Sequence, residues 1–167
     1  FEAEPAYERL ARLALANTDA RVEQGKPVTP AFLLAALLWP PLDRARAEHR
    51  AEGVTPAAAL HKAGSEVIAL QQHHISVPRR FSTFVREMWE LQPRLERPSA
   101  KRVARTAGHP RFRAAYDLLL LRERAELIEP GMGDWWTRYQ QADEAEQAEL
   151  ARSLGGRGRA GGGRAGG

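Results

Sequence analysis

Metal binding and phosphoryl transfer need few residues in recognisable spacings, so they are tested first. The chain has five histidines and no cysteine. His73 and His74 are adjacent and point about 100° apart on a helix, so one ion cannot easily take both. Glu144 and Glu146 have the acid-x-acid spacing of two-metal sites, but this spacing diverges on a helix. We predict no catalytic residue and no metal ligand in this chain.

Positive charge is concentrated in one central block. Residues 79–113 contain ten Lys/Arg and three Asp/Glu, a net charge of +7, whereas residues 114–154 contain four and nine, a net charge of −5. Residues 1–78 are close to neutral, and the last thirteen residues carry +3. Lysine and arginine supply the affinity for phosphates in nucleic-acid complexes, and aromatic side chains can stack on single-stranded bases. The block therefore indicates a polyanionic partner.

Within this block, five side chains have the most suggestive spacing. Lys101 and Arg105 share one helix face, with Arg102 beside them. Arg111 and Arg113 follow Pro110 in the first turn of a predicted helix, where backbone N–H groups already favour an anion. We predict nucleic-acid phosphate contacts from these five residues and from three more in the block, which gives Arg79, Arg80, Arg86, Lys101, Arg102, Arg105, Arg111 and Arg113.

Other interpretations of the same residues remain open. The arginines can solvate helix surfaces and pair with the acidic segment 114–154. Phe81, Phe84 and Phe112 lie on apolar stripes, which favours burial over base stacking, and Trp135 and Trp136 are expected to dock the last helix. A helix-turn-helix DNA-binding module around Gly108 is a further alternative.

The elements that position these residues are predicted to be helices throughout, because apolar residues recur at helical spacing and no strand alternation is sustained. We expect an all-α domain of about six to seven helices over residues 1–154, and a disordered basic Gly/Arg tail, "GGRGRAGGGRAGG", over residues 155–167. The predicted helices cover 5–23, 30–52 with a break at the proline pair 40–41, 55–74, 78–96, 100–107, a segment from 110 to a break at 130–133, and 134–154. The longest apolar run, Ala31–Trp39, is far short of the about 20 residues of a membrane span, so no membrane partner is expected.

Three long stretches resemble the helical body of the bacterial poly(A) polymerases, and their order and spacing agree as well. They read "NTDARVEQGKPVTPAFLLAALLWPPL", "SVPRRFSTFVREMWELQPRL" and "HPRFRAAYDLLLLRERAE". The likeness covers most of residues 5–139 and looks like the arginine-rich C-terminal region of that family, which belongs to the nucleotidyltransferase superfamily and is related to the enzymes that add CCA to tRNA. The tail departs from the family pattern, because relatives are usually rich in Arg, Lys and Pro, whereas this one is mostly Gly.

The resemblance implies a cytoplasmic polynucleotide adenylyltransferase that adds AMP from ATP to RNA 3′ ends with Mg²⁺, in mRNA polyadenylation, RNA processing and decay. Its catalytic head carries a Gly-Ser motif and metal-binding aspartates, which have no match here. Since the first Met is Met88, we expect the chain to be cut from a longer protein. The segment itself is expected to be non-catalytic, to need no cofactor and to bind single-stranded RNA 3′ ends. The alternative is a protein-interaction module that docks the polymerase onto RNA-decay proteins.

Overall fold

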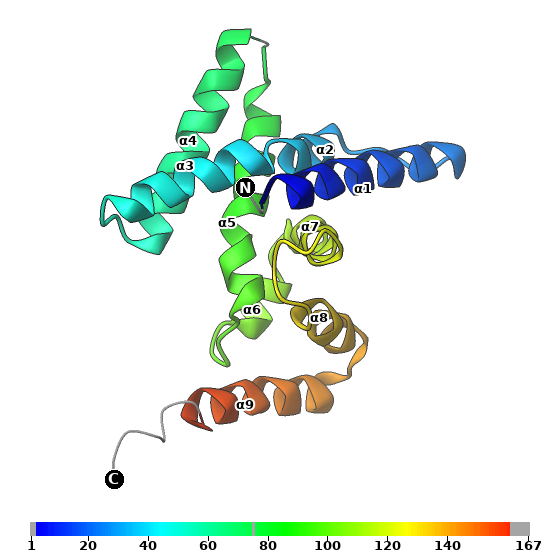
Figure 1. Cartoon of the computed structure of the whole chain (residues 1–167). Helices are drawn as coiled ribbons and strands as arrows, with labels where there is room; N and C mark the ends of the chain where they lie inside the picture. The colour runs from blue at the N-terminus through cyan, green and yellow to red at the C-terminus, as the bar shows by residue number, and fades with distance from the viewer. Residues whose placement is uncertain (1–2, 75, 161–167) are drawn as a thin grey trace.

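Nine helices and no strand form the part of the chain that the structure describes, residues 3–74 and 76–160 of a computed structural model (Figure 1). The predicted all-α class is confirmed, and the helix count is slightly above the expected six to seven. The helices are α1 (Ala3–Glu23), α2 (Pro30–Leu37), α3 (Trp39–Ala51), α4 (Pro56–His74), α5 (Arg79–Glu96), α6 (Val103–Ala107), α7 (Phe112–Arg124), α8 (Met132–Gln141) and α9 (Glu144–Ala160).

Two helix breaks explain the higher count. The first lies at Leu38, two residues ahead of the proline pair, so that Pro40 and Pro41 occupy the first turn of α3, where their missing N–H groups are not needed. The second separates α8 from α9. There the side chain of Asp143 accepts a hydrogen bond from the backbone N–H of Glu146 (2.8 Å), an N-cap that starts a new helix.

Left-handed residues follow three of the helices, namely Gly25 after α1, Gly53 (φ of 89°) after α3 and Glu126 after α7. Gly25, with φ of 67°, follows α1, where Lys26 N–H donates to Arg21 C=O and Gly25 N–H to Val22 C=O. The same pair of hydrogen bonds ends α7, but there the left-handed position is taken by Glu126, with φ of 63°. Glycine adopts this conformation without steric cost, whereas a residue with a Cβ does not.

The long helix α5 is the axis of the molecule and packs against α2, α4 and α7 (Figure 1). Its residues up to Trp89 contribute Val85, Met88 and Trp89 to a core that also holds the apolar faces of α1 to α4; we call this the N-terminal cluster. Its second half contributes Leu91 and Leu95 to a separate core with α6, α7 and α8, the C-terminal cluster. The run Leu118–Leu121 in α7 lies between them, with Leu118 and Leu121 in the N-terminal cluster and Leu119 in the C-terminal cluster.

A buried arginine ties α7 to α5. Arg122 is only 2% exposed, and it donates to Gln92 Oε1 and to Glu96 Oε1, both at 2.8 Å. Its guanidinium also lies 4.0 Å from the centroid of the Trp39 ring, on α3. Burial lowers the pKa of Arg122, while the neighbouring Glu96 carboxylate acts in the opposite direction.

At the C-terminal end, the boundary differs from the expected one. The helix α9 continues to Ala160, six residues into the segment predicted as a disordered tail, and the remaining residues 161–167 lie outside the described part of the chain. Among the described helices, none combines the length and the apolar character that crossing a membrane requires.

Candidate nucleic-acid interface

Lys101, Arg102 and Arg105 are exposed and lie just before or on α6. Figure 1 shows α6 at the lower end of α5. The first two lie in the turn over residues 100–102 that leads into α6, and Arg105 lies on α6 itself. The turn is closed by Ser99 C=O, which accepts from the N–H groups of Arg102 and Val103 at 3.0 Å. None of the three side chains makes an ion pair with a described residue. We call this trio the basic turn.

Arg79 and Arg80 lie at the opposite end of α5. Both are exposed in its first turn, and the guanidinium of Arg80 lies 4.9 Å from the centroid of the adjacent Phe81 ring. A helix of 18 residues is about 27 Å long, so this pair is well separated from the basic turn. The structure therefore does not gather all predicted contact residues at one place.

The other three predicted residues have partners within the protein. Arg86 donates to Ser65 Oγ (2.8 Å) and lies 3.3 Å from His61 Nδ1, which places it against α4. The Nε atom of Arg111 is 3.3 Å from the Glu87 carboxylate, and its guanidinium stacks at 4.2 Å on Phe84. Arg113 is 74% exposed, with Nε 3.7 Å from Asp117 and Nη1 donating to Gln140 Oε1 at 3.3 Å.

The helix end behind these arginines also differs from expectation. Pro110 lies in a turn, and α7 begins two residues later, at Phe112. The backbone N–H of Arg111 donates to His109 Nδ1 (3.0 Å), and that of Phe112 donates to His109 C=O (2.9 Å). Two donors at this helix end thus already have internal acceptors.

The aromatic residues of the basic block mainly pack in or against the hydrophobic core. Phe112 is 6% exposed and packs 5.2 Å from Trp136, and Trp89 is 1% exposed, with its indole N–H donating to Ala35 C=O. The expected docking of α8 through Trp135 and Trp136 is also observed, since both are buried in the C-terminal cluster. Phe81 and Phe84 are half-buried against the N-terminal cluster.

A groove of about 270 Å³ lies where the end of α1 and the start of α2 meet α5 and α7. Its walls carry three guanidinium groups, Arg21, Arg111 and Arg113, and one carboxylate, Asp117. Arg21 is remote from the basic block in sequence and was not predicted, because no local pattern links the last turn of α1 to α7. We call this space the arginine groove.

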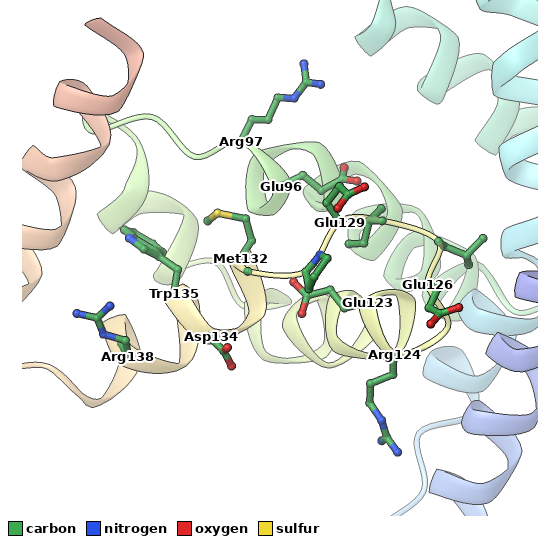
Figure 2. Close-up of a pocket in the computed structure, with 14 residues that line it drawn as sticks. Glu96, Arg97, Glu123, Arg124, Glu126, Glu129, Met132, Asp134, Trp135 and Arg138 are labelled. Carbon is green, nitrogen blue, oxygen red and sulfur yellow. The ribbon is translucent and has the colours of Figure 1, made fainter. Parts of the chain in front are cut away.

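A second, larger groove of about 1150 Å³ is open to solvent between the ends of α5 and α7 and the start of α8 (Figure 2). Five carboxylates and three arginines line it, and Leu127, Ile128 and Met132 add apolar surface. The backbone N–H of Gly133 donates to Oε1 of Glu123 (2.7 Å), a residue that lines the groove, and this bond joins α8 to α7. We call this space the acidic groove.

Two of the five histidines have acidic neighbours. His49 Nε2 lies 2.7 Å from Glu66 Oε1, and His61 Nδ1 lies 3.2 Å from Glu90 Oε1. Within residues 3–74 and 76–160, no group of three or more His, Asp or Glu side chains is arranged to hold a metal ion. Glu144 and Glu146 both lie in the first turn of α9.

The sequence also matches known proteins over most of its length. It is 36% identical over 152 residues to poly(A) polymerase I of Escherichia coli O157:H7, 34% identical over 152 residues to that of Salmonella typhi, and 35% identical over 147 residues to that of Haemophilus influenzae. These matches cover 86–89% of this chain but only 32–33% of each relative, so the chain spans about a third of their length.

A family model described as the polymerase A arginine-rich C-terminus matches residues 52–164. The match includes α4 to α9 and so contains all eight predicted contact residues. This chain belongs to the family of polymerase A arginine-rich C-terminal regions.

Proposed function

We propose that this chain is the RNA-binding region of a poly(A) polymerase and that the basic turn is its main contact with RNA phosphates. The observation that carries the proposal is that three exposed cations without ion pairs to described residues lie within five positions of the chain, whereas Arg111 and Arg113 of the same block have carboxylate partners. Three exposed cations that bind a polyanion displace the counterions condensed on its phosphates, which favours association.

The partner we propose is a single-stranded RNA 3′ end, bound without sequence preference. Phosphate contacts position a nucleic acid without reading its bases, and no described residue of the basic turn presents an aromatic platform for reading them. The basic turn would therefore hold the backbone of the RNA rather than select its sequence.

For the whole protein, we propose the reaction that the name of the relatives implies, transfer of AMP from ATP to RNA 3′ ends in the cytoplasm. We assign no residue of this chain to ATP or Mg²⁺, because the described residues contain no suitable carboxylate cluster. This region would contribute by holding RNA near a catalytic centre elsewhere in the protein.

Fluorescence anisotropy with a labelled oligoadenylate of about 12 nucleotides tests the proposal. Each phosphate contact to a single strand contributes about 0.7 to the slope of log affinity against log salt. Replacing Lys101, Arg102 and Arg105 by Gln should therefore make the negative slope of log affinity against log salt shallower by about 2. It should also weaken RNA binding about 100-fold near 0.1 M salt.

The matched control replaces three exposed cations elsewhere, Arg12, Lys62 and Arg152, by Gln. It removes the same charge from other surfaces and should change affinity far less. Equal losses in the two variants would mean that only net charge matters and would overturn the assignment to the basic turn. Competition with duplex DNA separates RNA binding from a helix-turn-helix role.

A protein-interaction role is the second candidate, and the acidic groove favours it. Its five carboxylates repel RNA, whereas its apolar residues Leu127, Ile128 and Met132 offer surface to a protein such as an RNA-decay partner (Figure 2). Such docking would depend weakly on salt, in contrast to the binding of RNA through phosphates.

A further inference from the structure

The arginine groove combines the features that recognise a nucleotide. Arg21 uses its Nε atom to donate to Pro27 C=O (2.9 Å), which fixes the side chain at the turn between α1 and α2. No hydrogen bond from its two terminal nitrogens is found among the described residues, so they remain able to bind a phosphate. Arg113 lines the groove from α7, so two helices supply cations to one space.

The arrangement of Arg111 suits a base rather than a phosphate. Its guanidinium stacks on Phe84, and its charge is compensated by Glu87 at 3.3 Å. A guanidinium plane held in this way is a surface on which an unpaired RNA base can stack. Phe32, Val28 and Ala114 provide apolar surface nearby, and Asn17 adds an amide that can donate and accept.

The size and charge of the groove limit the kinds of ligand that it can bind. A volume of about 270 Å³ is just below the usual range of small-molecule sites, about 300–1,000 Å³, which leaves room for a single nucleotide at most and not for a peptide or a helix. Its three arginines outnumber its one carboxylate, Asp117, which favours an anion. Arg105 and Arg111 are six residues apart, so their Cα atoms lie within about 20 Å, a distance that one RNA strand can bridge.

We propose that the arginine groove holds one nucleotide of the bound RNA, with its phosphate on Arg21 and Arg113 and its base stacked on Arg111. This proposal rests on the proposed RNA-binding function and adds a defined subsite to it. The groove would fix one position of an RNA strand that the basic turn holds only by its backbone.

Substitution of Arg21 gives the sharpest test, because this residue lies outside the basic block. With the same labelled oligoadenylate and the full chain, Arg21→Gln should weaken RNA binding about fivefold near 0.1 M salt. The negative slope of log affinity against log salt should become shallower by about 0.7. The matched control is Arg12→Gln on the same helix, whose side chain is 83% exposed and lies 4.0 Å from Glu8; it should leave the affinity within about twofold. Circular dichroism verifies that both variants keep their helices.

A second variant tests the groove by an increase in RNA affinity. This test does not require that the fold tolerates the loss of Arg21. Asp117→Asn removes the one negative charge that would face the phosphate and should strengthen RNA binding about two- to threefold. An oligomer of the same length with abasic ribose should bind the wild type more weakly than oligoadenylate and lose less affinity in an Arg111→Lys variant, which cannot offer the same planar surface.

The outcomes separate this proposal from the proposed function. If the wild type binds RNA but Arg21→Gln matches Arg12→Gln and Asp117→Asn changes nothing, the groove is not a nucleotide subsite, although the chain still binds RNA. If oligoadenylate and the abasic oligomer bind equally, the base has no place on Arg111 and the proposal is overturned. If the wild type does not bind RNA, the proposed function itself fails.

Discussion

Replacement of Arg122 by Met is expected to destabilise the fold strongly. Methionine has similar bulk but cannot donate, so the buried Gln92 Oε1 and the Glu96 carboxylate lose their donors at 2.8 Å. Hydrogen bonds to a charged group contribute about 1.5–3 kcal/mol each, and removing one partner of a buried pair costs about 3–5 kcal/mol. Glu96 is 27% exposed and can regain water, whereas Gln92 is fully buried and cannot, so we expect a loss near the lower value, about 3 kcal/mol.

Thermal and urea unfolding followed by circular dichroism measure this loss. For a chain of this size, about 3 kcal/mol corresponds to a Tm decrease of roughly 6–12 °C. Arg122→Lys should fall between wild type and Arg122→Met, because lysine keeps the charge but lacks the planar fork and the stacking on Trp39. The double variant Arg122→Met with Gln92→Met should lose less than the sum of the single variants, since it leaves no stranded amide. A loss below about 1 kcal/mol for Arg122→Met would refute the reasoning, because the network would then be dispensable.

Three further predictions concern single residues outside this network. Glu126→Gly should raise the free energy of unfolding by about 1 kcal/mol, because it relieves the left-handed backbone at φ of 63° and loses only an exposed ion pair with Arg9; an unchanged urea midpoint would contradict this. Asp143→Ala should lower stability or α9 helicity by about 1 kcal/mol through loss of the N-cap, whereas Asp143→Ser should retain most of it; hydrogen exchange in α9 measures the difference. Burial raises the pKa of Asp117, although the charges of Arg113 and Arg21 act in the opposite direction. The ionised carboxylate therefore destabilises the folded state at pH values above this pKa. We expect Asp117→Asn to be more stable than wild type at pH 7 and to lose this advantage on acidification.

Periodicity indicated apolar stripes such as that of Phe112, which is buried, but not the polar residues that are buried on such stripes. Arg122 continues the stripe of Ala115, Leu118 and Leu119 at helical spacing, and Gln92 follows Val85 and Met88 in the same way. Their polarity concealed this, because an arginine is rarely buried without a partner and its partner Glu96 lies on another helix. The signal for burial was therefore present in the spacing, while the pairing depended on how α5 and α7 pack.

The helix boundaries were also predicted only in part. The break ahead of Pro40 and Pro41 was expected to within a few residues, since proline restricts the residue that precedes it. The break at Asp143 was missed, although Asp143 and Glu146 have the spacing of a capping box. A run of helix-favouring residues around them concealed this local signal.

The sequence indicated which charged residues the candidate site contains, but not how the fold arranges them. Net charge identified the basic block, but the block spans both ends of α5, so its members lie on separate surfaces. The pairing of Arg111 with Glu87 arises within the block itself, and the approach of Arg21 to Arg113 requires α1 to pack against α7. Contacts between residues so far apart in sequence have no local signature.

The division of the apolar interior between two clusters bears on how the molecule opens. In the described chain, α6 and α8 contribute buried apolar residues to the C-terminal cluster, while α1 to α4 supply the N-terminal one. Cooperative units of this kind exchange their amide protons at different rates. We therefore expect the helices of the two clusters to exchange at different rates, so that local opening around the basic turn need not unfold the whole chain.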